Sequence, residues 1–185
     1  MEAKGKTVGI IGLGLIGGSI ALRLKEKGYT THVLGVDLND KAASEALSLG
    51  IIDQKSSLEE LMEQADVAIV AIPVDATKKL LSALLDRCEA NQVVLDMGST
   101  KSVIAKVVES HSNRSNYVAC HPIAGTENNG PSAAFPKLFE NKVNIICDKE
   151  LSAESALNTA LEITNHLGMR TKYMDSIEHD RHIAY

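Results

Sequence analysis

One histidine of this sequence stands where it could carry proton-transfer chemistry. His121 directly follows an apolar stretch over residues 117–120, predicted as a strand, and it precedes Pro122. Proline disfavours the helical conformation in the residue before it, so the imidazole is expected to project from the strand end. An imidazole with a pKa near about 6.5 can accept a proton from an alcohol while a hydride leaves. We take His121 as a candidate general base, with an ordinary structural histidine as the alternative.

Three glycines near the N-terminus have the spacing G-x-G-x-x-G. Gly12, Gly14 and Gly17 follow an apolar run and open an amphipathic stretch, and Asp37 closes the next apolar run. In a dinucleotide site the first glycine permits a tight turn, the second lets a pyrophosphate approach, and the third lets the helix pack closely. The helix N-terminus favours the phosphates, and the acid accepts hydrogen bonds from a ribose. The order and spacing predict such a site, and the alternative is a βαβ unit whose glycines serve only the turn.

The residues after Asp37 favour NAD over NADP as the cofactor. Leu38, Asn39 and Asp40 offer no basic side chain to a 2′-phosphate, and Lys41 is the nearest cation. The predicted cofactor-binding residues lie in the glycine turn and at later strand ends. They are Gly12, Leu13, Gly14, Leu15, Ile16, Gly17, Asp37, Leu38, Ile72, Pro73 and Ser99.

Two of those later strand ends could face a ligand. Pro73 ends the apolar run 67–72, where it either contacts the nicotinamide ribose or only terminates the strand. Asp96 ends the next predicted strand and opens a small polar turn that leads to Lys101, a natural cradle for an anion at a helix start. Within this turn Ser99 is a candidate helix N-cap whose hydroxyl could also face the ligand.

Nucleophilic and metal chemistry are not expected. Cys120 neighbours His121, but adjacent residues on an extended chain point to opposite faces, so Cys120 is predicted as a small core residue. The histidines near the C-terminus show no metal-ligand spacing, although His179 and His182 could share a helix face. We therefore predict no metal site.

These side chains must be positioned by alternating strands and helices. Strands are expected at residues 6–12, 32–37, 51–52, 67–72, 93–96, 117–120, 143–147 and 170–173. Helices are expected at 15–27, 40–49, 58–64, 75–86, 100–111 and 153–166, with a last one starting after Asp175 or Ser176. Unbroken apolar runs suit strands that are buried on both faces of a parallel sheet. The pattern predicts an α/β fold with a doubly wound, mostly parallel, Rossmann-like sheet that binds ligands at the carboxyl ends of its strands.

The composition limits the classes of partner. The chain has 185 residues with a formal net charge of −5, no basic cluster, and 3% aromatic residues without Trp. A nucleic-acid partner is therefore not expected. No apolar run reaches membrane-spanning length, and the N-terminus lacks the apolar region of a signal peptide. Three cysteines without metal spacing suit reduced thiols, so a cytoplasmic location and no membrane partner are expected.

The motifs together resemble the prephenate dehydrogenase family, which includes the arogenate dehydrogenases. The similarity covers essentially the whole chain, and its most specific segment is His-Pro-Ile-Ala-Gly-Thr-Glu at residues 121–127. Further matching segments are 12–19, 96–101, Leu138-Phe139 with the following strand, and His179-Asp180.

This resemblance implies NAD(P)-dependent oxidation of prephenate to 4-hydroxyphenylpyruvate, with loss of carbon dioxide, in tyrosine biosynthesis. The family's catalytic histidine falls on His121, which would hydrogen-bond the ring hydroxyl and assist its deprotonation. Ser99 matches a serine that contacts the same region, and Thr126 and Glu127 match a loop at the mouth of the cofactor and substrate site. The alternatives are arogenate as the substrate, another oxidoreductase such as a β-hydroxyacid dehydrogenase, and a non-catalytic dinucleotide-binding fragment.

The resemblance also implies residues beyond this chain. Proteins of the family continue into a helical domain that supplies the dimer interface and an arginine for the substrate carboxylate. We therefore expect residues 1–174 to form the NAD-binding domain and 175–185 to begin a connecting helix. The chain would then be a shortened piece that binds NAD but turns over prephenate poorly, while the full-length protein is a homodimer.

Overall fold

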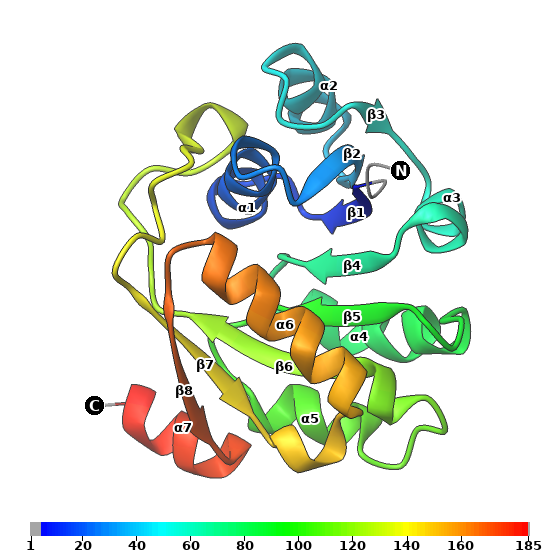
Figure 1. Ribbon diagram of the computed structural model, residues 1–185, viewed down its shortest axis with the longest axis vertical. Helices are drawn as coiled ribbons and strands as arrows, with labels where there is room; N and C mark the ends of the chain where they lie inside the picture. Colours follow the sequence, from blue (N-terminus) through cyan, green and yellow to red (C-terminus); the bar gives the residue numbers. More distant parts are fainter. Residues whose placement is uncertain (1–4, 185) are drawn as a thin grey trace.

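The chain folds around one eight-stranded sheet. The computed structural model describes residues 5–184, so the outer ends of the predicted ranges 1–174 and 175–185 lie outside the described residues (Figure 1). The strands are β1 (Lys6–Ile11), β2 (Thr30–Val36), β3 (Gln54–Lys55), β4 (Val67–Val70), β5 (Val93–Asp96), β6 (Tyr117–Pro122), β7 (Val143–Cys147) and β8 (Arg170–Met174). The α-helices are α1 (Leu15–Glu26), α2 (Asp40–Ser48), α3 (Leu58–Gln64), α4 (Val74–Asp86), α5 (Ser102–Val108), α6 (Glu154–His166) and α7 (Ser176–Ile183). Short 3₁₀ turns are η1 (Arg114–Asn116), η2 (Pro131–Ala133) and η3 (Lys149–Leu151).

The sheet is doubly wound, as the sequence predicts. Its strand order is β3-β2-β1-β4-β5-β6-β7-β8, so the chain starts in the middle, runs to one edge, returns beside β1 and continues to the other edge. Neighbouring strands pair in parallel except β6 and β7, which are antiparallel. The order reverses between β1 and β4, which is where ligands bind in open α/β sheets. The prediction of a mostly parallel α/β sheet is confirmed.

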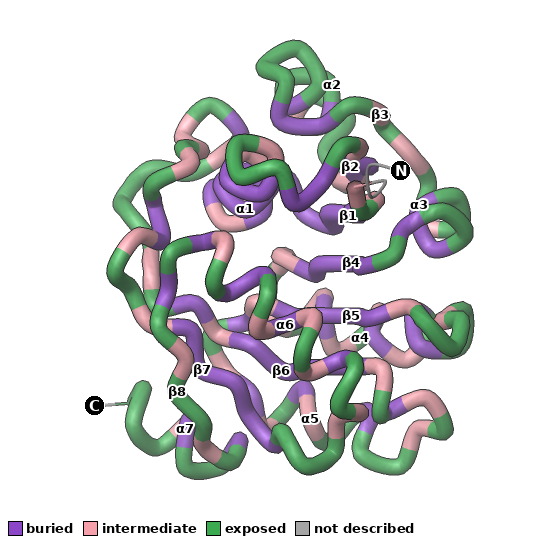
Figure 2. The backbone as a smooth tube through the Cα atoms, viewed as in Figure 1, coloured by how far each residue is buried: buried purple, intermediate pink, exposed green. Residues whose placement is uncertain are grey.

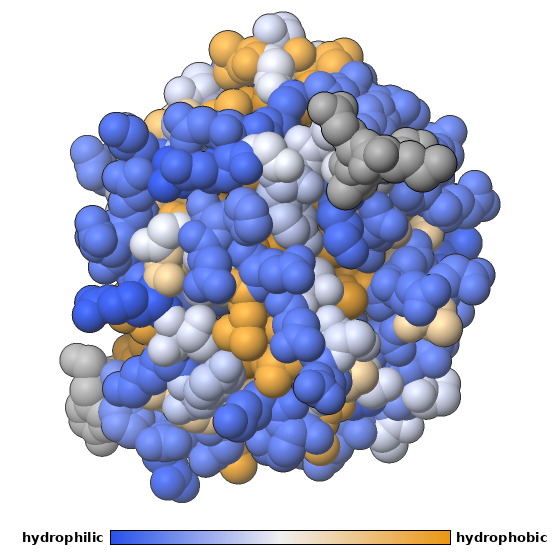
Figure 3. All heavy atoms as spheres, in the orientation of Figure 1, coloured by the Kyte–Doolittle hydropathy of each residue, from blue (hydrophilic) through white to orange (hydrophobic). Residues whose placement is uncertain are grey.

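Helices cover both faces of the sheet. Apolar side chains of α1, α2 and α6 pack on one face, and those of α3, α4 and α5 pack on the other. Every residue of β4 and β5 is buried, as expected for unbroken apolar runs between two helical layers (Figure 2). The face in Figure 3 is mainly hydrophilic, with apolar side chains gathered over α2, where Leu47 is exposed. Within residues 5–184 no helix combines the length and the hydrophobicity that a membrane span needs.

Two predicted elements are displaced in the structure. The short strand expected at residues 51–52 lies instead at Gln54–Lys55. The N–H groups of Ile51 and Ile52 donate to the Ala46 carbonyl at the end of α2, and both side chains lie in the core, so these residues continue the helix turn instead of pairing with β2. The helix expected at 100–111 is shorter, because α5 begins only at Ser102.

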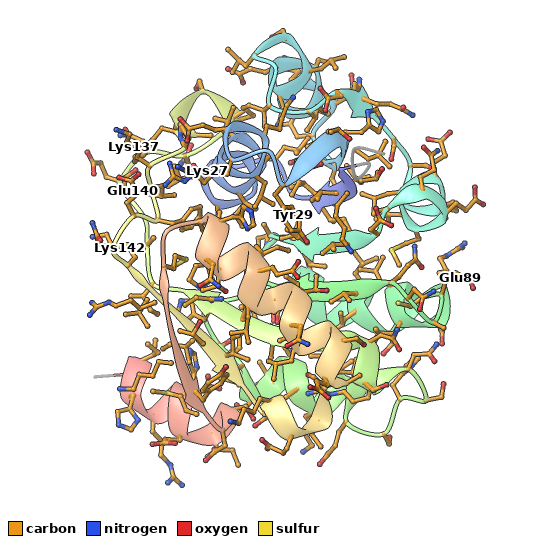
Figure 4. The ribbon with its side chains drawn as sticks, in the orientation of Figure 1. Lys27, Tyr29, Glu89, Lys137, Glu140 and Lys142 are labelled. Carbon is orange, nitrogen blue, oxygen red and sulfur yellow. The ribbon has the colours of Figure 1, made fainter. Side chains whose placement is uncertain are left out.

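The segment between β6 and β7 is attached to α1. The N–H of Phe135 donates to the Ser19 hydroxyl at 3.0 Å. Arg23 of α1 forms ion pairs with Glu26 at 2.8 Å and with Glu140 of this segment at 2.9 Å. Figure 4 labels Glu140 beside α1, and Figure 1 shows the upper part of the segment next to that helix. The helix that follows the glycine turn is therefore held against the segment that follows His121 by a hydrogen bond and an ion pair.

Candidate functional site

The glycine turn has the backbone geometry that its sequence predicts. Gly12 directly follows β1 and has φ +96°, a conformation that residues with side chains rarely adopt, and a Cβ there would lie 2.3 Å from the Ala71 carbonyl oxygen. A Cβ on Gly17 would lie 2.0 Å from the Gly12 carbonyl oxygen, so this glycine permits close contact between α1 and β1. Gly14 is the N-cap of α1 and faces open space, which leaves the helix N-terminus accessible to an anion.

Asp37 is fixed to this turn by its carboxylate. Its Oδ2 accepts the N–H of Leu13 at 2.9 Å, and its Oδ1 accepts the N–H of Asn39 at 2.8 Å. Each carboxylate oxygen keeps a lone pair for a further donor, such as a ribose hydroxyl. The structure thus holds the predicted ribose acceptor at the end of β2 and next to the glycine turn.

A cavity of about 490 Å³ opens beside Asp37. Its wall is mainly apolar, and its charged side chains are Asp37 and Lys79 of α4. This lining suits an adenosine moiety. Sequence reasoning missed Lys79 because it lies on a helix remote from the glycine motif. The lining residues are Ile11, Gly12, Gly14, Val36, Asp37, Leu38, Leu58, Ala71, Ile72, Pro73, Ala76, Lys79 and Leu80.

The cavity includes only some of the predicted cofactor residues. Ile72 and Pro73 belong to its wall. Because β4 ends at Val70, Pro73 does not itself end the strand and lies instead at the N-cap position of α4. Leu13 and Leu15 point into the core, and Leu13 contributes its N–H to Asp37. Ile16 is half-buried and packs against the same core. These three residues therefore support the glycine turn from the core and do not line the cavity.

A buried ion pair supports the turn that follows β5. Lys101 and Asp96 have fully buried side chains, and the Lys101 ammonium donates to Asp96 Oδ2 and, at 2.7 Å, to the Cys120 carbonyl. The Tyr117 hydroxyl donates to Asp96 Oδ1 at 2.6 Å. Burial raises the pKa of Tyr117 well above its usual value, and the Asp96 charge adds to the effect. These bonds connect the polar turn after β5 to the backbone immediately before His121.

Ser99 is not the helix N-cap that its position predicts. It is exposed in the turn, and α5 begins three residues later at Ser102 with Lys101 at the N-cap position. The first amides of α5 are instead accepted by Asp180 of α7, from Lys101 at 2.7 Å and from Ser102 at 2.9 Å. The cap comes from a distant segment, so Ser99 is free to face a ligand.

His121 lies within β6 and contacts a second histidine. Its Nδ1 is 2.8 Å from Nε2 of His179, whose own Nδ1 is 2.8 Å from Oδ1 of Asp180. The two imidazole rings meet edge to face, with centroids 5.0 Å apart and planes at 66°. Burial, and to a lesser extent the charges of Lys101 and His179, lower the pKa of His121 to about 4, although the Asp180 charge acts in the opposite direction. His121 is therefore a neutral imidazole at neutral pH.

The pairing with His179 was not predicted. The only signal in the sequence was the His179-Asp180 match to the family pattern, because 58 residues separate the two histidines. His179 is fully buried, whereas His182 is exposed and contacts the Glu178 carbonyl, so the two do not form a shared face. No cluster of three or more metal-ligating side chains occurs among residues 5–184.

The remaining predicted residues lie around the same part of the chain. Thr126 and Glu127 are exposed in the segment after β6 and line a separate hollow of about 600 Å³. Cys120 is 1% exposed within the core, and burial raises its thiol pKa to about 12, which agrees with its predicted packing role.

Comparison with known proteins identifies the family. Residues 20–173 match the model of the prephenate dehydrogenase nucleotide-binding domain. The chain is 32% identical over 183 residues to a prephenate dehydrogenase of Bacillus subtilis, covering 97% of this chain and 49% of that protein. A crystal structure of prephenate dehydrogenase from A. aeolicus, in complex with hydroxyphenyl propionate and NAD+, superposes with a TM-score of 0.88 at 27% identity, over 97% of this chain and 63% of the other. Synechocystis arogenate dehydrogenase gives a TM-score of 0.86 at 25% identity, with the same two coverages.

The chain spans about half the length of the Bacillus subtilis relative, while almost all of its own residues are matched. The match includes the β-strands of the sheet from β2 to β7 and the segment that carries His121. The chain therefore belongs to the prephenate dehydrogenase nucleotide-binding domain family.

Proposed function

We propose that this chain binds NAD and supplies the cofactor site and general base of a prephenate dehydrogenase. The observation that supports this most strongly is the placement of two groups at one edge of the sheet. The Asp37 carboxylate is hydrogen-bonded to the glycine turn, and His121 lies near the end of β6, the third strand beyond the switch point. The carboxyl ends of parallel strands meet at this edge, which is where such sheets bind dinucleotides.

The proposed binding mode follows from the residues present. The diphosphate lies over Gly12 and Gly14 at the N-terminus of α1, and the adenosine ribose donates to Asp37. The adenine occupies the part of the apolar cavity beside Leu38, and Ile72 and Pro73, which belong to the wall of the same cavity, are proposed to extend from it toward the nicotinamide ribose. When bound, NAD+ accepts a hydride from the substrate.

The chain's own part in the reaction is proton transfer and orientation. In the proposed reaction the ring hydroxyl of prephenate transfers its proton to His121 as the hydride on the same ring carbon leaves. The bond between the ring and its carboxylate then breaks, carbon dioxide is released, and the electron pair of that bond makes the ring aromatic. The ring oxygen takes a proton back, which gives 4-hydroxyphenylpyruvate. His121 suits this role because burial keeps its imidazole neutral and able to accept a proton. Ser99 and the loop with Thr126 and Glu127 are proposed to contact the substrate.

Arogenate is the second candidate substrate, because the Synechocystis arogenate dehydrogenase superposes almost as well as the prephenate enzyme. The two substrates differ in a keto and an amino group. We propose that three features lie in the part of the relatives that this chain does not match: the contacts that discriminate prephenate from arogenate, the arginine that binds the substrate carboxylate, and the homodimer interface. A cytoplasmic location is proposed with the three free thiols as support.

Binding and turnover test the proposal separately. Calorimetry with the 185-residue chain should detect NAD binding that is tighter than NADP binding. NADH formation should then be assayed with prephenate and with arogenate, for the chain alone and with the remainder of the full-length protein. We expect weak or no turnover by the chain alone and loss of turnover in full-length His121→Asn with NAD binding retained. Absence of binding to either dinucleotide at millimolar concentration would overturn the proposal.

A further inference from the structure

We propose that His179 and Asp180 are positioning residues that hold His121 in one tautomer, with the proton on Nδ1 and the lone pair on Nε2. This inference rests on the proposed role of His121 as a general base. It assigns a task to two side chains of α7 that no motif spacing had connected with that histidine.

The direction of the hydrogen bonds follows from what Asp180 can do. An ionised carboxylate is only an acceptor, and Asp180 already accepts from the Lys101 N–H, the Ser102 N–H and the Ser102 hydroxyl. Nδ1 of His179 faces the same carboxylate at 2.8 Å, so Nδ1 must carry a proton and donate it.

The second bond then has only one arrangement for neutral rings. A neutral imidazole that is protonated on Nδ1 has its lone pair on Nε2. Nε2 of His179 therefore accepts, and the facing Nδ1 of His121, 2.8 Å away, must donate. The lone pair of His121 is thereby placed on Nε2, the nitrogen left to accept a substrate proton. The assignment comes from the hydrogen-bond network, as it does for any histidine without observed hydrogens.

Burial and charge make this arrangement stable. His179 is 0% exposed, so no solvent competes for either of its ring nitrogens. Although burial raises the pKa of Asp180, hydrogen bonds from Ser102, from His179 and from the backbone lower it to about 2. The carboxylate therefore stays charged and acceptor-only in the pH range where the base would work.

The same chain of contacts stabilises the product of proton transfer. When Nε2 of His121 takes a proton, the ring becomes an imidazolium whose Nδ1–H still donates to His179. The positive charge of His121 is then connected through His179, by two contacts of 2.8 Å, to the negative charge of the Asp180 carboxylate. This interaction opposes the neighbouring Lys101 charge, which disfavours protonation of His121. A third group that orients a base and stabilises its cation is a general solution for histidine catalysis.

Nitrogen NMR of the chain labelled with 15N-histidine tests the tautomer without any need for turnover. At neutral pH, wild-type His121 should show a protonated Nδ1 and an unprotonated Nε2. In Asp180→Asn, the new amide N–H can donate to His179 Nδ1 and reverse both bonds, so His121 should change to the Nε2-protonated form. In His179→Leu the Nδ1–H of His121 loses its acceptor, so His121 should no longer be held in the Nδ1-protonated form. In His179→Gln the side-chain oxygen can still accept this N–H and should preserve the wild-type tautomer.

His182→Gln is the matched control, because His182 lies on the same helix but is exposed and hydrogen-bonds only to the backbone of Glu178 in the described structure. It should leave the His121 signals unchanged. In the full-length enzyme, Asp180→Asn should lower kcat by about 10²- to 10⁴-fold with a much smaller effect on the KM for NAD.

The results separate this inference from the proposed function. An Nε2-protonated His121 in the wild type would overturn the inference, as would a tautomer that stays unchanged in both Asp180→Asn and His179→Leu variants whose backbone spectra show a native fold. The expected tautomers together with no NAD binding would instead contradict only the proposed function.

Discussion

Gly17 and Gly12 touch so closely that a Cβ atom on Gly17 would lie 2.0 Å from the Gly12 carbonyl oxygen. That contact seats α1 on β1 and aims the helix N-terminus at the glycine turn. Gly14, between them in sequence, has open space where its Cβ would be. The same glycine-to-alanine change should therefore have different consequences at the two positions.

We expect Gly17→Ala to destabilise the fold and Gly14→Ala to weaken only the binding of NAD. Overpacking at Gly17 should cost at least about 1–3 kcal/mol, which lowers Tm by about 2–4 °C per kcal/mol for a chain of this size. Gly14→Ala should keep nearly the wild-type Tm but weaken NAD binding by about tenfold or more, because the methyl group occupies the space of the diphosphate. Thermal unfolding and calorimetry measure the two effects. Unaltered NAD affinity in Gly14→Ala would contradict the proposed phosphate position.

Removing the Asp37 carboxylate should weaken NAD binding. The side chain would no longer accept from the ribose and would release the Leu13 N–H, and hydrogen bonds to a charged group contribute about 1.5–3 kcal/mol each. Asp37→Ala should thus raise the Kd for NAD by about tenfold or more, as measured by calorimetry. Glu45→Ala removes the same charge from the exposed face of α2 and should leave the Kd unchanged.

Breaking the buried ion pair should destabilise the chain strongly. Lys101→Met leaves the Asp96 carboxylate buried without its cation, which typically costs about 3–5 kcal/mol. Urea unfolding should show this loss, and adding Asp96→Asn should recover part of it because the uncompensated charge is removed. Lys106→Met, an exposed lysine of α5, should change stability by less than about 0.5 kcal/mol. Equal stability of Lys101→Met and the wild type would show that the pair is not buried in solution.

The lowered pKa of His121 should make stability depend on pH. Its folded pKa is about 4 against an ordinary 6.5, so between these values the unfolded chain binds a proton that the folded chain does not. The contribution of this group is fully present above pH 6.5 and is lost as pH falls toward about 4. The free energy of unfolding, measured with urea at several pH values from 4 to 7.5, should rise less steeply with pH in His121→Gln than in the wild type. An identical slope in both would mean that His121 titrates at its ordinary value.

The cofactor half of the site could be predicted from sequence because its parts are local. Gly12, Gly17 and Asp37 belong to one strand-helix-strand unit, and the backbone requirements of that unit restrict which residues can stand there. The positive φ of Gly12 and the contact of Gly17 are direct consequences of that unit. The strand pattern also predicted His121 at the carboxyl end of its strand, where the structure has it as the last residue but one of β6.

The partners of His121 could not be predicted because they depend on tertiary packing. His179 comes from α7, which packs against α5, a helix far from it in the sequence. Asp180 also explains the failure of the Ser99 prediction, because a carboxylate 78 residues away from Ser102 does the capping that a local serine usually does. Periodicity reports which face of a helix is apolar, and it does not report which distant side chain satisfies a helix end.

The hydrogen bond from the Phe135 N–H to the Ser19 hydroxyl holds the segment between β6 and β7 against α1. It joins the helix beneath the proposed diphosphate to the segment that carries Thr126 and Glu127. For the binding mode proposed above, we expect this bond to hold the diphosphate site and that segment at one separation, so that the chain reorganises little when NAD binds. Half-molecules such as AMP or nicotinamide mononucleotide would each engage a single end and gain nothing from that fixed span.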